Sequence, residues 1–178
     1  MVSLSSCRLL HISQDLLRLF HRRRSLAAKK LCRQGFQRFS RYLSTVDTSL
    51  PPEEYMLEMG LAYIDFALKN SDFFLLMFTT APLLFPKFAV ENKPGAQNLS
   101  QEDDAFTILV RGIERCVRQG VFHLQPNYGV LEMAHTAWAL VHGIAMLQLS
   151  LMNAMPFEAE QIRIALRIQF YGMKVLTV

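Results

Sequence analysis

The chain has 178 residues, of which 51% are hydrophobic and 19% are charged. A chain of this length forms one domain by default and buries about 70% of the surface that its unfolded form exposes. The high apolar fraction argues against a disordered protein. The net charge of +4 hides an asymmetry, because residues 1–45 hold ten Lys or Arg and one acid, whereas the remainder holds nine Lys or Arg and fourteen acids.

Cysteine usage and sorting signals together predict a cytoplasmic protein. The three cysteines are scattered, with no CxxC pair and no metal-ligand spacing, a pattern that is typical of a reducing compartment. The first thirty residues lack a continuous apolar stretch followed by a small-residue cleavage site, so they do not resemble a secretory signal.

The sequence of the N-terminal half predicts three helices. Apolar residues recur with a loosely helical spacing among arginines over residues 25–43, which predicts the first helix. The stretch Thr48–Glu54 places two prolines and two acids where a first helical turn favours them, and predicts a second helix that ends near Asn70. Ser71–Asp72 can cap a short third helix over residues 73–80.

The C-terminal half predicts three more helices after a loop at residues 87–99. Residues 100–103 precede a helix in the manner of a capping box, and Gly120 is its natural stop. A long helix is expected over residues 127–152, and a last one, opened by a proline, over residues 157–176.

The last of these segments carries a conflicting pattern. Apolar side chains stand at every second position of residues 162–170, as in a strand. The length of the segment and the proline and acids at its start favour a helix, because strands usually have about 5 to 6 residues. Such a helix is apolar around most of its circumference, so we expect it to pack against its own core on one side and against a partner on the other.

The long helix holds the only tryptophan and two histidines within 25 uncharged residues, 133–157. His135, Trp138 and His142 follow the i, i+3, i+7 spacing and therefore share one helical face, a candidate wall of a ligand site. The run is also long enough to cross a bilayer. The polar residues among these 25 would then lie in or near lipid, which is costly, so burial in a soluble helical dimer is the favoured interpretation.

Three blocks carry a family resemblance: Trp138-x-x-x-His142-Gly143, preceded by Leu61–Asn70 and Phe73–Phe78. In this order the blocks resemble the WHG-type C-terminal domain of TetR-family transcriptional regulators, over residues 28–178. The resemblance implies an all-α helical bundle of the TetR C-terminal type that binds a small hydrophobic effector and forms a homodimer.

The resemblance also implies the site residues. Aromatic, methionine and histidine side chains on apolar faces are core residues by default, and that interpretation stays open for Trp138 and His142. The same side chains suit a cavity for an apolar small molecule. The ligand-binding residues that we expect are Trp138, His142, His135, Phe66, Phe74, Met77, Phe78 and Phe106. The last two helices are expected to form a four-helix interface with their two-fold mate through Ala137, Val141, Ile144, Gln148, Ile162, Leu166, Phe170 and Met173.

Catalytic and metal-binding patterns are missing from the sequence. We find no GxSxG, HExxH, Gly-rich phosphate loop or pair of carboxylates on one helical face. His135 and His142 are two helical turns apart and do not form a convincing metal site. We therefore predict a protein that is not an enzyme and uses neither a cofactor nor a metal.

Residues 1–27, called the basic N-terminal segment below, depart from the family. TetR-like proteins begin with a helix-turn-helix, and this chain has no such run. Three interpretations stand: a remnant left by truncation or a frameshift, which we favour, a mitochondrial-type transit peptide, and a basic arm that touches phosphate without reading sequence. DNA binding by this chain is accordingly expected to be weak, non-specific and sensitive to salt.

These observations predict a TetR-like regulator, a repressor by the resemblance, represented mainly by its ligand-binding and dimerisation domain. In the family, a ligand with different affinities for two states shifts the DNA-binding heads. The alternative is a small mitochondrial or membrane-associated helical protein that combines a transit-like start with the apolar residues 133–157.

Overall fold

The computed structural model describes residues 27–28, 30–80, 104–150 and 157–175. These residues are helical apart from turns and one isolated β-bridge between Gln125 and Tyr128, which confirms the all-α prediction. In chain order the elements are an N-terminal helix over residues 30–43, α2 (Pro52–Lys69), α3 (Ser71–Leu75), the π-helix η1 (Leu76–Thr80), α6 (Ala105–Arg118), α7 (Val130–Leu149) and α8 (Ala159–Val175).

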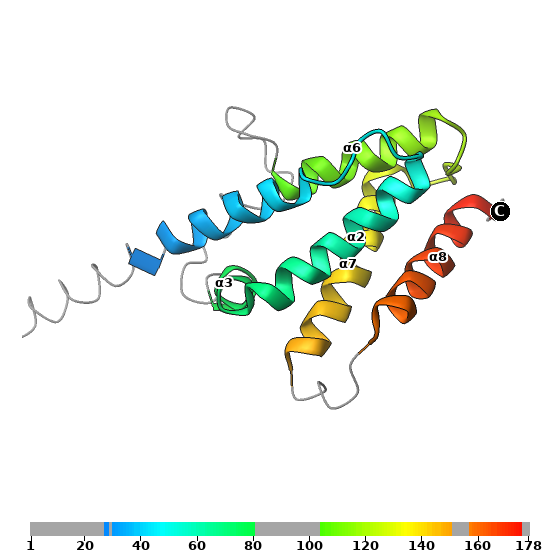
Figure 1. Ribbon diagram of the computed structural model, residues 1–178. Coiled ribbons are helices and arrows are strands. Elements are labelled where there is room, and N and C mark those ends of the chain that lie inside the picture. The colour runs from blue at the N-terminus through cyan, green and yellow to red at the C-terminus, as the bar shows by residue number, and fades with distance from the viewer. Residues whose placement is uncertain (1–26, 29, 81–103, 151–156, 176–178) are drawn as a thin grey trace, which may run out of the picture.

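Helix α2 is the centre of the bundle, since α3, α6, α7 and α8 all contact it. In Figure 1, α6 lies above α2, α8 lies to the right, and the N-terminal helix projects to the left. The described side chains between these helices form one apolar core, in which no charged residue is buried.

Helix α2 begins and ends where the sequence predicts. Pro52 occupies its first turn, where the missing N–H of proline costs no hydrogen bond, and Glu53 and Glu54 lie in the same turn, where their charge favours the helix dipole. At the other end the backbone N–H of Asn70 donates to the carbonyl oxygen of Phe66 at 2.9 Å.

The segment after α2 differs from the predicted single helix over residues 73–80. Helix α3 already starts at Ser71, without a cap from the Ser71–Asp72 side chains, and continues into the π-helix η1. The hydroxyl of Thr79 donates to the carbonyl oxygen of Leu75 at 2.5 Å. Apolar spacing over so short a run does not distinguish α from π turns, and π turns are frequent at functional sites.

Helix α6 is capped by Asp104, whose Oδ1 accepts a hydrogen bond from the N–H of Thr107 at 2.8 Å. The predicted cap at residues 100–103 and the predicted loop at 87–99 lie outside the described residues. Helix α6 stops just before Gly120, as predicted, and that glycine has a φ of +70°, a conformation in which a side chain would be strained.

Helix α7 begins three residues later than the sequence predicts. Asn127 has a φ of +59° and therefore belongs to the preceding turn. The backbone N–H of Gly129 donates to Oε2 of Glu132 at 2.8 Å, so the glutamate of the first turn satisfies a donor that the helix leaves unpaired. The described part of α7 ends at Leu149, and the last residues of the predicted helix lie outside the description.

Helix α8 buries only one of its two apolar faces, and the predicted dimer contacts of α8 lie on the buried face. The buried face carries Ile162, Leu166, Phe170 and Met173. The exposed face carries Ile164, Ile168, Tyr171 and Val175. Ala137, Val141 and Ile144 of α7 are also buried in the single chain. Seven of the eight residues predicted as dimer contacts therefore belong to the core of the single chain, and their contact with a partner stays a prediction.

Arg115 of α6 stabilises the loop between the N-terminal helix and α2. Its Nη1 and Nη2 donate to the carbonyl oxygens of Thr48 and Leu50 at 2.9 and 2.7 Å. We expect Arg115→Leu to lower the free energy of unfolding by about 2 kcal/mol, because these charge-assisted hydrogen bonds disappear. Urea denaturation measures this change, and the exposed Arg118→Leu on the same helix, expected within about 0.5 kcal/mol of the parent, is the control.

Candidate functional site

Seven rings from six helical elements meet near Trp138 and form what we call the aromatic cluster. Its members are Phe39, Tyr63, Phe74, Phe78, Phe106, Trp138 and His142. The ring of Trp138 lies 5.5 Å from Tyr63, 5.6 Å from Phe106 and 6.1 Å from Phe78, measured between ring centroids. The N-terminal helix takes part through Phe39, at 6.3 Å from Trp138. The cluster therefore joins the first and the last third of the chain.

The predicted histidine–tryptophan face of α7 is part of this cluster. His142 lies 5.0 Å from Phe78 and 5.5 Å from Phe74, again between ring centroids. His135 is exposed, yet its ring lies 4.8 Å from that of Phe106. His135, Trp138 and His142 therefore all lie beside aromatic side chains that were also predicted as ligand-binding residues. His135 lies at the outer margin of the aromatic cluster.

The two remaining predicted ligand residues lie deeper in the core. Phe66 is fully buried and packs against Phe39 at 4.9 Å between ring centroids. Met77 is also buried, and its sulfur lies only 2.6 Å from the position that a Cβ on Gly35 of the N-terminal helix would take. Both side chains fix the N-terminal helix against the bundle.

A tyrosine–histidine pair is the polar feature of the aromatic cluster. The hydroxyl of Tyr63 and Nδ1 of His142 are 2.9 Å apart and share a hydrogen bond. Burial raises the pKa of Tyr63 above its ordinary value and lowers the pKa of His142. Both groups are therefore held neutral, because a charge would be poorly solvated among the surrounding rings.

The lowered pKa of His142 predicts how stability depends on pH. The unfolded chain protonates this histidine as pH falls through its ordinary value of 6.5, whereas the folded chain does so only at lower pH. The free energy of unfolding contributed by His142 is therefore complete above that value and is lost as pH falls below it. We expect His142→Gln to flatten the pH dependence in this window, measured by urea denaturation at a series of pH values. Gln119→Ala, at an exposed position that does not titrate, should keep the parental slope.

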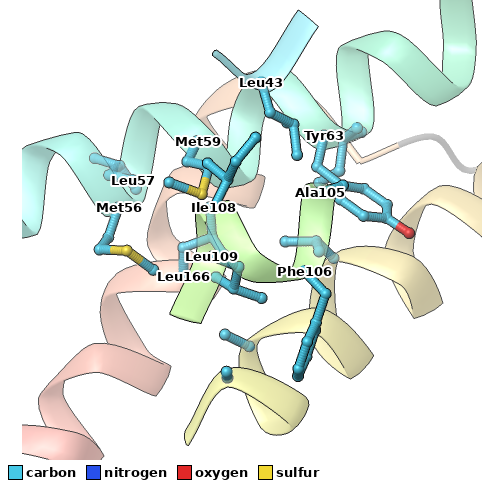
Figure 2. Close-up of a cluster of buried hydrophobic side chains, with 14 of the residues drawn as sticks. Leu43, Met56, Leu57, Met59, Tyr63, Ala105, Phe106, Ile108, Leu109 and Leu166 are labelled. Atoms are coloured by element: carbon cyan, nitrogen blue, oxygen red, sulfur yellow. The ribbon is translucent and has the colours of Figure 1, made fainter. Parts of the chain in front are cut away.

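A small internal cavity lies on the other side of Trp138, between α2, α6, α7 and α8. Its volume is about 20 Å³, and its lining includes Met56, Met59 and Gly60 of α2. Figure 2 shows how Met56, Met59 and Leu109 approach one another there, with the hydroxyl of Tyr63 pointing toward α7. This volume holds about one water molecule, whereas drug-sized ligands need about 300 Å³ or more.

A ligand can therefore enter this interior only if side chains move. The methionines of α2 were missing from the predicted site, although they are the most adaptable side chains of its lining. Met56 also packs closely, since its sulfur lies 2.5 Å from where a Cβ on Gly112 would be. The spacing of apolar residues in α2 predicts that they are buried, but it does not show which of them border a cavity.

Electrostatics restrict what this interior can hold. Among the described residues no charged side chain is buried, and no group of three or more His, Cys, Asp or Glu is placed to hold a metal ion. An ionised ligand would lose its water without gaining an opposite charge. The arrangement suits binding of a neutral apolar molecule, with the tyrosine–histidine pair as its polar contact.

Helix α7 is also long and apolar enough to cross a membrane. Its mean hydropathy is 1.3, and 33% of it is buried. The buried part packs on α2 and α6. Core helices of soluble proteins share this composition, so α7 alone does not assign the chain to a membrane.

Comparison with known proteins agrees with this architecture. No curated protein matches the chain. A solved structure described as "Structure of a protein with unknown function from Rhodococcus sp. RHA1" superposes with a TM-score of 0.63 at 21% identity, covering 83% of this chain and 71% of that one. At this identity the likeness establishes a shared fold only.

The sequence profile of one family identifies the chain more closely. The family described as "Tetracyclin repressor-like, C-terminal domain" matches residues 56–172, a range that runs from early α2 almost to the end of α8. The matched range includes Tyr63, Trp138 and His142, and it covers more than half of the chain. The protein therefore belongs to the TetR-like family, through the C-terminal domain of these regulators.

Proposed function

We propose that the chain is the effector-sensing and dimerisation part of a TetR-like transcriptional regulator, of the repressor type, and that it acts without catalysis. The observation that supports this best is the tyrosine–histidine pair inside the aromatic cluster. Tyr63 is only 3% exposed, and its bond to His142 places a neutral donor and acceptor where an otherwise apolar ligand needs one polar contact.

The effector that fits is uncharged and largely apolar. It displaces the flexible side chains of Met56 and Met59 and enlarges the 20 Å³ cavity toward Trp138. An adaptable lining of this kind accepts ligands of several shapes. Ionised compounds are rejected, because the described interior offers them no opposite charge.

The N-terminal helix is the element that responds to the effector. Phe39 on that helix touches both sides of the site, at 5.0 Å from Tyr63 and 6.3 Å from Trp138 between ring centroids. A ligand that pushes these rings apart binds more tightly to the conformation in which the N-terminal helix has moved than to the one in which it has not. This difference in affinity between two conformations is what a switch requires.

The chain acts as a soluble cytoplasmic homodimer. Ile164, Ile168 and Tyr171 of α8 and Leu147 of α7 are exposed apolar side chains, and exposed apolar patches mark interaction sites. A second copy can cover the same surface around a two-fold axis. The membrane-associated alternative rests on the apolar composition of α7, and solubility of the full chain without detergent separates the two.

A matched pair of compounds tests the effector class. Naphthylmethanol and naphthoate share one ring system and differ in charge. We expect naphthylmethanol to raise the melting temperature of the full chain by several degrees at saturation, because a ligand that binds only the folded state stabilises it. Naphthoate should leave the melting temperature unchanged. Equal shifts for both compounds, or a shift for naphthoate alone, contradict a charge-free site.

A further inference from the structure

A second hollow lies on the outer side of α2, away from the aromatic cluster, and we call it the α2 groove. Its volume is about 780 Å³. Its floor is α2 itself, one wall is the end of the N-terminal helix with the loop to Leu50, and the other wall is the start of α8 with Phe157.

The α2 groove is both acidic and apolar. Four carboxylates and one guanidinium line it, an excess of three negative charges. Glu58 already pairs with Arg163 at 2.9 Å, and Asp65 pairs with Lys69 at the same distance. Glu54 has no ion-pair partner among the described residues. The apolar side chains that face the groove include Leu68 and Phe157, exposed by 42% and 45%.

We propose that the basic N-terminal segment of the same chain docks in the α2 groove. Residues 1–26 hold five arginines and one aspartate, so their charge is complementary to that of the lining. Their apolar residues Leu9, Ile12, Leu16 and Leu19 recur every three to four positions, the spacing that presents one apolar face when a segment is helical. An acidic groove with an apolar floor matches both features.

The length of the segment allows this docking within one molecule. The N-terminal helix over residues 30–43 spans about 20 Å at 1.5 Å per residue, and its far end, at Tyr42, lies in the groove wall. Residue 27 lies about 23 Å from Tyr42 at the same rise, and a chain that turns back before residue 27 covers that distance with about 15 residues even when fully helical. The apolar positions from Leu9 to Leu19 then lie within reach of α2.

Docking has a consequence for the arginines. Arginines that pair with Glu54 and the neighbouring carboxylates are not available to phosphate groups, because they cannot form ion pairs with both at the same time. The lining of the α2 groove shares no residue with that of the internal cavity, so the two sites can be altered separately by substitution.

Disulfide trapping in the full chain tests the proposal. Cys7 belongs to the segment, whereas Cys32 and Cys116 are fully buried and their pKa values are raised to about 11 and about 12. Cys7 is therefore the natural partner for a cysteine introduced in the groove. We introduce Leu68→Cys on its floor and, as the matched control, Gln119→Cys at an exposed site at the end of α6, and oxidise both with diamide.

We expect the intramolecular disulfide from Cys7 to form at least about fivefold faster with the cysteine at Leu68 than with the one at Gln119, because docking raises the local concentration. Adding Glu54→Lys to the Leu68→Cys chain, or raising the salt concentration, should remove most of this advantage. Equal rates at both positions overturn the proposal. A disulfide that forms only between two chains also overturns it, because the groove then belongs to a second copy.

Discussion

Leu166→Arg should abolish the cooperative unfolding transition of the chain, whereas Ile168→Arg, two positions further along α8, should leave the fold intact. Leu166 is 1% exposed, and its Cδ1 lies 2.8 Å from where a Cβ on Gly60 would be. The described core holds no buried acid to pair with an arginine at this position, and an unpaired buried charge costs several kcal/mol. Circular dichroism during thermal denaturation measures the loss.

The Ile168→Arg variant separates folding from association. Ile168 is 69% exposed in the single chain, so a charge there costs the monomer little. On the proposed dimer surface the same charge should shift the protein from dimer to monomer in light scattering at unchanged helicity. A folded Leu166→Arg chain contradicts the described core, and a dimeric Ile168→Arg chain removes the exposed face of α8 from the interface.

The second large effect is expected for Phe39→Ala, with a loss of about 3 to 5 kcal/mol in the free energy of unfolding. Phe39 is fully buried and is the ring that joins the N-terminal helix to Tyr63, Phe66, Phe78 and Trp138. Its removal leaves a cavity that these neighbours cannot fill completely. Urea denaturation measures the loss, with the exposed Gln37→Ala as control.

A second, milder substitution at Phe39 reports on the coupling between the effector site and the N-terminal helix. If Phe39 transmits the effector's presence to the N-terminal helix, Phe39→Leu should fold and still bind naphthylmethanol. Binding of naphthylmethanol should then change the hydrogen-exchange protection of the amide protons of residues 30–38 less in Phe39→Leu than in the parent chain. An unchanged response would show that the N-terminal helix moves without Phe39.

The sequence predicts the helices well, because their ends carry local signals. The prolines and acids at the start of α2 and the glycine after α6 act through neighbouring backbone groups, so no tertiary information is needed. The grouping of Trp138 with His142 follows from helical spacing in the same way. The partner Tyr63 comes from a helix 79 residues away from His142 in sequence, and spacing within one helix cannot predict that contact.

The two apolar faces of α8 show the limit of apolar patterns. Leu166 and Ile168 have equally apolar side chains, and only the packing of α2 against α8 decides which of them is buried. The role of Met56 and Met59 was missed for a related reason. A cavity depends on how several helices meet, and each helix shows only that its own residue is apolar.

The central claim is that an uncharged apolar molecule binds beside Trp138 and uses the tyrosine–histidine pair. Trp138 is the only tryptophan, so its emission during a titration of the full chain with decanol tests this most directly, with decanoate as the charged counterpart. We predict a saturable spectral shift with decanol alone, and about tenfold weaker binding in Tyr63→Phe, which keeps the ring and loses the hydroxyl, an effect of about 1.4 kcal/mol. Unchanged emission with decanol, or equal affinity in Tyr63→Phe, would contradict the claim.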